Sequence, residues 1–160
     1  MNRFILSDES MTVKFGSAIG RCIRKNALIY LTGQLGAGKT YVAKGIAAGL
    51  GSEGQVSSPT YNIMNIYEFD GGRIMHFDLY RLENEEELYG VGLFDFVKNG
   101  ICLIEWADKF KESLPDDYLE ITLSYFENGR AADVSLSGEK YADLYKNVIT
   151  KLNEDFGERS

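Results

Sequence analysis

This 160-residue chain has few cysteines and no long hydrophobic run. Its two cysteines, Cys22 and Cys102, are too few for a disulfide scaffold and lack metal-ligand spacing, so we expect small buried side chains in a reducing compartment. No apolar run approaches the roughly 20 residues that span a bilayer, which excludes a transmembrane helix. The first residues lack the apolar core and the cleavage site of a signal peptide, so the sequence predicts a cytoplasmic protein without a membrane role.

Positive charge is also in short supply. Lysine and arginine number 17 against 24 aspartate and glutamate residues, which gives a formal net charge of −7 and a pI near 4.8. Because phosphate binding favours clustered lysine and arginine, such a chain is a poor candidate for holding nucleic acid by itself. Hydrophobic residues make up 44% of the sequence, which excludes intrinsic disorder, and the length fits one domain.

Hydrophobic periodicity divides the chain into helices and strands. Residues 11–23 carry apolar side chains at helical spacing and form one face of an amphipathic helix, with Asp8 or Ser10 as its cap. The apolar run 27–31 fits a buried strand, followed by a glycine-rich turn and a helix over 39–50. The remaining expected helices are 83–89 and 139–152, and the remaining strands are 61–69, 73–78, 101–104, 119–125 and 133–136.

The order of these elements predicts an α/β domain. The early strand–loop–helix unit is typical of parallel pairing at the centre of a sheet. Turn signals at 70–72 and at Asn128–Gly129 each separate two strands and predict antiparallel hairpins. We therefore expect one domain over residues 1–152, with a mixed parallel and antiparallel sheet flanked by helices, and a polar C-terminal tail over 153–160.

The most specific motif is a full match to G-x-x-x-x-G-K-[ST], spelled G-Q-L-G-A-G-K-T over residues 33–40. Its glycines allow backbone angles that turn successive N–H groups inward as an anion nest, and the following helix directs its positive end at the same point. A glycine-rich turn that binds nothing is the alternative, but the strand before and the helix after are the context that the motif requires. The sequence thus predicts a single P-loop NTPase domain, with candidate nucleotide contacts at Gly33, Gly36, Ala37, Gly38, Lys39 and Thr40.

Hydrolysis needs more than this loop. In such motifs the lysine, here Lys39, reaches the β- and γ-phosphates, and the hydroxyl, here Thr40, holds Mg²⁺. A metal-organising acid and a group that places water are also required. Glu105 ends the apolar run 101–104, the usual form of a second metal-site strand, and Asp78 ends another strand. Because such groups gather at the carboxyl ends of strands in open α/β sheets, we expect both acids at the site, with solvated strand-end acids as the alternative.

Three further residues stand close to these acids in the sequence or resemble parts of a hydrolysis site. Thr60 lies between the loop's helix and the next strand, where small P-loop hydrolases have a switch hydroxyl, or it belongs to a simple Pro-Thr turn. His76, the one histidine, shares a strand face with Asp78, which allows a hydrogen bond or a supporting catalytic role, although lone strand histidines are more often structural. Trp106, the one tryptophan, is expected to pack, with a nucleotide or partner surface as the alternative.

Taken together, these motifs resemble the TsaE (YjeE) family, whose members are small ATPases of bacterial tRNA threonylcarbamoyladenosine biosynthesis. The resemblance covers about Ser7 to Leu123 and lies in an ordered set: the phosphate loop, S-P-T-Y over 58–61, H-F-D-L-Y-R over 76–81 and I-E-W-A over 104–107. The loop alone would be unspecific, but the set in a chain this short is highly specific. It implies a P-loop fold that binds ATP or ADP with Mg²⁺.

The resemblance also implies partners and residue roles. In this family TsaD and TsaB, which share a fold, form threonylcarbamoyladenosine beside the anticodon. The ATPase resets or drives their complex rather than transferring the group, and tRNA is contacted mainly through the partners. By matching position, the implied functional residues are the phosphate and Mg²⁺ contacts Lys39 and Thr40, the Mg²⁺-site acid Glu105, the second acid Asp78, the switch threonine Thr60 and a threonine near the nucleotide base, Thr12.

Two positions depart from the family pattern, and two other functions stay open. Gln34 stands where the family usually has Asp or Asn, and Tyr41 where a second Thr is common; both can tune loop polarity or hydrolysis rate. A small-molecule kinase would use the same loop, but such kinases add an arginine-rich lid, whereas Arg73, Arg81 and Arg130 are scattered. A nucleotide-gated scaffold with little hydrolysis is the other alternative.

Overall fold

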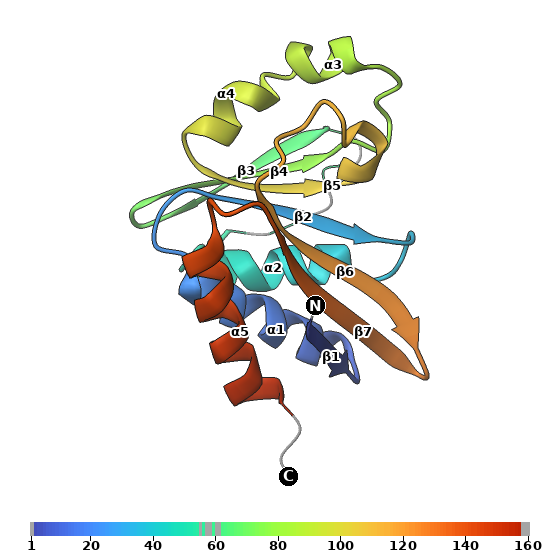
Figure 1. Ribbon diagram of the computed structural model, residues 1–160, viewed down its shortest axis with the longest axis vertical. Coiled ribbons are helices and arrows are strands. Elements are labelled where there is room, and N and C mark those ends of the chain that lie inside the picture. Colours follow the sequence, from blue (N-terminus) through green and yellow to red (C-terminus); the bar gives the residue numbers. More distant parts are fainter. Residues whose placement is uncertain (1, 55, 57–58, 60–61, 158–160) are drawn as a thin grey trace.

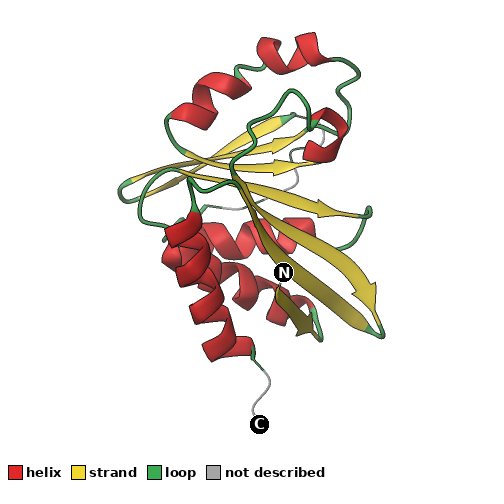
Figure 2. Cartoon of the chain, in the orientation of Figure 1, coloured by secondary structure: helices red, strands yellow, loops and turns green. Residues whose placement is uncertain are grey.

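The computed structural model describes residues 2–54, 56, 59 and 62–157 of the chain. Within them a seven-stranded sheet has the order β1-β7-β6-β2-β5-β4-β3 and carries helices on both faces (Figure 1; Figure 2). The strands are β1 (Asn2–Leu6), β2 (Ala27–Gly33), β3 (Met64–Phe69), β4 (Gly72–Asp78), β5 (Ile101–Glu105), β6 (Tyr118–Phe126) and β7 (Gly129–Ser137). The helices are α1 (Glu9–Cys22), α2 (Lys39–Gly49), α3 (Glu85–Gly90), α4 (Leu93–Lys98), the 3-10 turn η1 (Ala107–Phe110) and α5 (Ala142–Phe156). None of the described helices has the length and apolarity that crossing a membrane requires.

The four central strands, β4, β5, β2 and β6, run parallel, and the hairpin partners β3 and β7 pair antiparallel outside them. β2 pairs with β5 up to Leu31 opposite Glu105, and β4 pairs with β5 in the register that sets Asp78 opposite Glu105. The expected mixed α/β sheet is therefore confirmed. Its parallel strands bring their carboxyl ends to one edge of the sheet, and that edge carries the glycine-rich loop.

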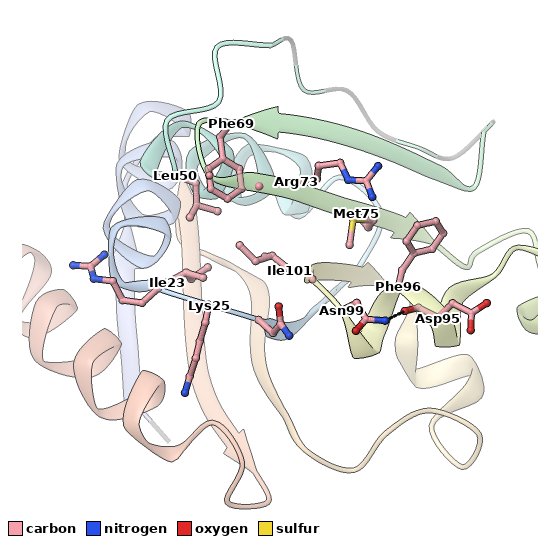
Figure 3. Close-up of a pocket in the computed structure, with 15 residues that line it drawn as sticks. Ile23, Lys25, Leu50, Phe69, Arg73, Met75, Asp95, Phe96, Asn99 and Ile101 are labelled. Atoms are coloured by element: carbon pink, nitrogen blue, oxygen red, sulfur yellow. Dashed lines mark hydrogen bonds between the residues drawn. The ribbon is translucent and has the colours of Figure 1, made fainter.

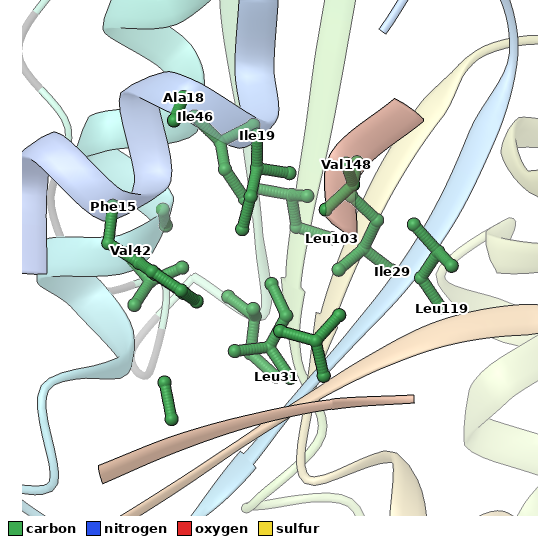
Figure 4. Packing of buried hydrophobic residues seen from close by; sticks show 14 of the residues in the cluster. Phe15, Ala18, Ile19, Ile29, Leu31, Val42, Ile46, Leu103, Leu119 and Val148 are labelled. Atoms are coloured by element: carbon green, nitrogen blue, oxygen red, sulfur yellow. The ribbon is translucent and has the colours of Figure 1, made fainter. Parts of the chain in front are cut away.

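β2 is buried on both faces because its side chains alternate between two hydrophobic cores. Ile29 and Leu31 point into the core under α1, α2 and α5, which Figure 4 shows. Tyr30 points into the other core, on the side of α3 and α4, where its ring stacks 4.0 Å from that of Tyr118. Helices on both faces explain why this strand is a continuous apolar run in the sequence.

α1 and α2 lie side by side with their backbones in close contact. A methyl group added at Gly16 or Gly20 of α1 would clash with the backbone of α2. One added at Gly45 or Gly49 of α2 would clash with the backbone of α1. Space, rather than an unusual backbone angle, thus requires glycine at these four positions.

The structure corrects several expected boundaries. α5 begins at Ala142 and continues to Phe156, so the segment expected as a polar tail from residue 153 starts as helix. The Phe156 ring packs edge-on at 5.9 Å from that of Phe15, which ties this end of the chain to α1. β1 and α4, of five and six residues, are elements that the sequence analysis does not predict. Of the two caps considered for α1, Asp8 is the one in use.

The two cysteines differ in exposure. Cys102 in β5 is fully buried, and burial raises the pKa of its thiol to about 12. Cys22 at the end of α1 is only half-buried, in contrast to the expectation, and burial raises the pKa of its thiol as well. Since the thiolate is the reactive form, Cys102 is a packing residue rather than a nucleophile.

Candidate nucleotide-binding site

The glycine-rich loop connects the carboxyl end of β2 to the amino end of α2. Gly36 and Gly38 have φ angles of 79° and 107°, in the left-handed region that other residues rarely adopt, so both positions favour glycine. Gly33 lacks room for a side chain, because a Cβ there would lie 2.6 Å from the carbonyl oxygen of Leu123. α2 starts at Lys39, and the unpaired N–H groups of its first turn face back toward the loop. This arrangement is an anion nest.

Lys39 supplies the cation of the nest and is only 5% exposed. Its ammonium donates to the Gly33 carbonyl at 2.7 Å and lies 4.0 Å from the centre of the Trp106 ring. Burial lowers the pKa of Lys39, and the nearby carboxylates of Glu105 and Asp78 oppose that shift. The Lys39 ammonium is shielded from water and contacts a neutral carbonyl and an aromatic ring. Phosphate oxygens would be stronger partners for it, because their bonds to the ammonium are charge-assisted.

Two carboxylates lie beside Lys39 because neighbouring strands end in register. Asp78 is the last residue of β4 and Glu105 is the last residue of β5, and the two pair directly across the sheet. Each is 3% exposed. Together with Lys39, Thr40 and Trp106 they line a cavity of about 170 Å³ next to the loop. The fold thus brings together candidate residues from three separate segments of the sequence.

The oxygen donors around this cavity fit Mg²⁺. Thr40 offers a hydroxyl, and Asp78 and Glu105 offer carboxylates, which are the hard ligands that this ion prefers. Across the described ranges, no three histidine, cysteine or acidic side chains form a metal cluster. An ion bound here would complete its shell with phosphate oxygens and water, as Mg²⁺ does in phosphate-binding proteins.

His76 contacts Glu105 rather than Asp78, the acid with which the sequence associates it. Its Nε2 lies 2.6 Å from Glu105 Oε2, and its Nδ1 lies 2.9 Å from the Tyr67 hydroxyl. The imidazole is completely buried. In the register of the sheet His76 lies opposite Leu103, so its ring reaches a side chain two positions further along β5.

Trp106 follows Glu105 in an unusual backbone conformation. Its φ of 61° and ψ of 31° are left-handed, which costs a bulky residue about 1–2 kcal/mol. The ring lies against the Lys39 ammonium and 4.9 Å from the Tyr80 ring. Because the ring forms part of the cavity wall, the geometry favours the lining role over simple packing.

A second cavity, of about 280 Å³, lies between the loop, the start of α1 and the β6–β7 turn. Thr12 is on its wall, and its hydroxyl donates to the Asp8 carbonyl at 3.0 Å. Tyr41 is on the wall too, and a hydrogen bond with Glu9 raises the pKa of its hydroxyl. The departure from the family pattern at Tyr41 therefore links α2 to α1 beside the loop.

Two residues of the β6–β7 hairpin hold the loop from outside, and the sequence did not predict them as site residues. Arg130 donates from Nε to the Ala37 carbonyl at 3.1 Å and from Nη2 to the Gly36 carbonyl at 3.2 Å. The Tyr125 hydroxyl donates to the Leu35 carbonyl at 3.2 Å, and its ring lies 4.2 Å from the Arg130 guanidinium. In a trans peptide the N–H points away from the C=O, so holding the Leu35 and Ala37 carbonyls outside turns the N–H groups of Gly36 and Gly38 toward the interior.

Thr60, the expected switch threonine, lies outside the described residues. Ala37 is buried in the loop, and its N–H donates to the Gln34 carbonyl at 3.0 Å. Since a backbone group makes this contact, the turn does not depend on which side chain stands at position 34.

A larger cavity, of about 480 Å³, opens at the opposite edge of the sheet, near the amino ends of β2 and β5 (Figure 3). Its walls include the apolar side chains of Ile23, Phe69 and Ile101, and Lys25 and Arg73 lie on different sides of it. Because Lys25 and Arg73 do not converge on one point, these two side chains do not form a common phosphate site.

Comparisons with known proteins identify the family of this chain. The family model described as threonylcarbamoyl adenosine biosynthesis protein TsaE matches residues 6–132. A Haemophilus influenzae protein, named tRNA threonylcarbamoyladenosine biosynthesis protein TsaE, is 36% identical over 154 residues, which are 92% of this chain and 95% of that protein. Proteins of the same name from Nostoc sp. and Treponema pallidum are each 34% identical, over 90% and 74% of this chain and 91% and 87% of their own.

A solved structure has a similar fold. The crystal structure of YdiB from Bacillus subtilis is similar to this chain with a TM-score of 0.77 at 26% identity, over 93% of this chain and 94% of that one. The fold is therefore that of a single P-loop NTPase domain with a mixed sheet flanked by helices. The matched residues 6–132 include the loop, both carboxylates and the β6–β7 turn, and the chain belongs to the TsaE family of tRNA threonylcarbamoyladenosine biosynthesis proteins.

Proposed function

We propose that this protein binds ATP or ADP with Mg²⁺ and hydrolyses ATP in the formation of threonylcarbamoyladenosine in tRNA. One observation carries the proposal: buried Lys39 lies between the glycine-rich loop and two in-register carboxylates, Asp78 and Glu105. A site that only held phosphate would be weakened by two buried acids, because like charges repel. Acids in this position would be favourable in a site that also holds a divalent cation, which would offset their charge.

The loop and Lys39 hold the phosphates in this proposal. Inward N–H groups and the start of α2 surround the phosphate oxygens, and the Lys39 ammonium exchanges the Gly33 carbonyl for the β- and γ-phosphates. The rest of the nucleotide extends from the loop into the second cavity, where Thr12 lies near the base. The buried ammonium gains charged partners in place of neutral ones, which favours binding.

Thr40, Glu105 and Asp78 are the residues that would hold Mg²⁺, directly or through water. When bound, Mg²⁺ neutralises charge on the phosphates and aligns them for in-line attack. Asp78 would complete the coordination shell of Mg²⁺ or orient the attacking water. The Tyr80 N–H donates to Asp78 Oδ1 at 2.9 Å and so holds this carboxylate in place. Thr60 is proposed as the hydroxyl that senses the γ-phosphate.

We further propose that ATP turnover acts on a complex of TsaD-like and TsaB-like proteins in the cytoplasm. The family's place in tRNA threonylcarbamoyladenosine biosynthesis supports this step. A net charge of −7 argues against a tight grip on tRNA by this chain alone, so tRNA contact falls mainly to the partners.

Reconstitution tests the proposal. ATP hydrolysis is measured for the protein alone and with TsaD-like and TsaB-like proteins, and tRNA modification is measured with and without the protein. We expect Mg²⁺-dependent hydrolysis that the partners stimulate, and repeated rounds of modification only with this protein and ATP. Tight nucleotide binding without hydrolysis in either condition would instead favour a nucleotide-gated scaffold.

Phosphate transfer to a small acceptor without partners would favour a kinase. The positions of two arginines do not fit the phosphate-clamping lid of a small-molecule kinase. Arg73 lines the cavity at the opposite edge of the sheet, and Arg130 is engaged with loop carbonyls. A panel of small acceptors incubated with ATP and Mg²⁺ separates this outcome from hydrolysis.

A further inference from the structure

Three side chains on three neighbouring strands form a buried chain of hydrogen bonds that ends at the site. The Tyr67 hydroxyl of β3 lies 2.9 Å from His76 Nδ1 of β4, and His76 Nε2 lies 2.6 Å from Glu105 Oε2 of β5. Their exposed fractions are 5%, 0% and 3%. In register terms Tyr67 lies opposite Ile74 and Glu105 opposite Asp78, so the chain runs diagonally from the interior of the sheet to its loop edge.

The direction of these bonds follows from the chemistry of the groups. An ionised carboxylate only accepts, so the proton in the bond to Glu105 is on His76 Nε2. In a singly protonated ring Nδ1 is then an acceptor, and it receives the Tyr67 O–H. With Glu105 ionised and the ring singly protonated, both bonds donate toward Glu105. The bond uses Oε2, which leaves the lone pairs of Oε1 for a metal ion or water.

We infer that His76 is a positioning residue that fixes the Glu105 carboxylate for Mg²⁺, and that Tyr67 fixes His76 in turn. The inference rests on the proposed function. A glutamate side chain has three rotatable bonds, so a strand position alone does not determine where its oxygens lie. The short bond from a buried imidazole determines it, in the way that outer-shell partners orient metal ligands.

Two substitutions of His76 separate positioning from packing. In His76→Gln the amide nitrogen can occupy the place of Nε2 and donate to Glu105, whereas in His76→Asn it reaches only the place of Nδ1. Both replace a buried ring by a smaller polar group. We expect His76→Asn to lower kcat about 10- to 100-fold and to raise the Mg²⁺ concentration at half-maximal rate. His76→Gln is expected to recover most of the parental kcat and most of the parental Mg²⁺ dependence. The KM for ATP and the affinity for ADP without Mg²⁺ should change less than about threefold in either variant.

A milder pair of variants removes one hydroxyl at a time. Tyr67→Phe deletes the bond to His76, and Tyr30→Phe deletes a part-buried bond of equal length, from the Tyr30 hydroxyl to the Pro115 carbonyl at 2.9 Å. We expect Tyr67→Phe to lower kcat several-fold and to raise the Mg²⁺ requirement, and Tyr30→Phe to do neither. Equal effects of Tyr67→Phe and Tyr30→Phe would show that these hydrogen bonds only support the fold. Equal loss of kcat in His76→Gln and His76→Asn would show the same.

One readout works even if the proposed function fails. Trp106 is the one tryptophan and directly follows Glu105, so its fluorescence reports on Mg²⁺ added to protein that already holds ADP. If the parent protein hydrolyses no ATP with its partners, the proposed function fails, and the Mg²⁺ titration of Trp106 fluorescence still tests the inference. A midpoint that shifts about tenfold in His76→Asn and returns in His76→Gln supports it. An unchanged midpoint in His76→Asn overturns it.

Discussion

The two flanks of the sheet around β2 support the candidate site in different ways. On the β6–β7 side, Arg130 and Tyr125 bind loop carbonyls from outside and shape the backbone. On the β4–β5 side, strand ends in register present Asp78 and Glu105 as side chains toward Lys39. One flank thus determines the path of the main chain, and the other supplies charged groups.

Under the proposed function, nucleotide binding and ATP hydrolysis depend on different parts of the same small domain. A nest of N–H groups recognises phosphate through shape, so its supports can be lost in part without loss of the site. Each carboxylate acts through its charge at a single point of the site, so the loss of either one should lower the hydrolysis rate. Variants of the loop, of the β4–β5 flank and of the β6–β7 flank should therefore give distinct patterns of binding and turnover.

The largest effect is expected at the residue between the two flanks. Lys39→Ala removes the ammonium and its charge-assisted bonds to two phosphates, each worth about 1.5–3 kcal/mol, so nucleotide affinity should fall about 100-fold or more. Titration calorimetry with ADP measures this loss. Lys44→Ala, an exposed lysine of the same helix, is the matched control and should bind as the parent does. If Lys39→Ala binds ADP as tightly as the parent protein does, the loop is not the phosphate-binding site.

The next effect separates the flanks. Glu105→Gln and Asp78→Asn keep the size of each side chain but remove its charge, so ADP binding without Mg²⁺ should stay within a few-fold of the parent. Hydrolysis should fall about 100-fold or more, since groups that organise transition-state charge are worth that much. Single-turnover rates with saturating ATP measure it, with Asp95→Asn at the opposite edge of the sheet as the control. If both variants hydrolyse ATP at the parental rate, the acids are not part of the site.

The smallest effect is expected on the other flank. Arg130→Met removes two hydrogen bonds to partly exposed loop carbonyls, with a net value of about 1 kcal/mol, so nucleotide affinity should weaken about fivefold. The hydrolysis rate of bound ATP should stay near that of the parent, in contrast to the carboxylate variants. Arg73→Met is the control. A large loss of turnover with unchanged affinity would mean that the two flanks are not specialised as described.

The sequence predicts most of what depends on local pattern. The loop has a fixed spacing, its glycines have a geometric reason, and the strand before and helix after are visible as periodicity. Glu105 and Asp78 were also predictable, because acids that end buried strands meet at one edge of a parallel sheet. The two turn signals gave both hairpins and hence the mixed sheet.

Contacts between distant segments were not predictable from one sequence. The Asn128–Gly129 turn places Tyr125 opposite Arg130, but no local signal says that this hairpin borders a loop more than 90 residues earlier. His76 was associated with Asp78 by strand spacing, yet the partner across the sheet, Glu105, is set by the register between β4 and β5. Strand register is a tertiary property, and it decided which acid the histidine contacts.

The contact between α1 and α2 has a mechanical consequence. With glycines at the crossing, the two backbones touch without side chains that could slide or repack between them. Thr12 on one helix and Lys39 at the start of the other thus belong to one stiff unit, and we expect the spacing between them to stay constant through a nucleotide cycle. Any shape change that γ-phosphate loss transmits to a partner surface would then arise outside this unit, most directly in the strands and turns that carry Asp78, Glu105 and Trp106.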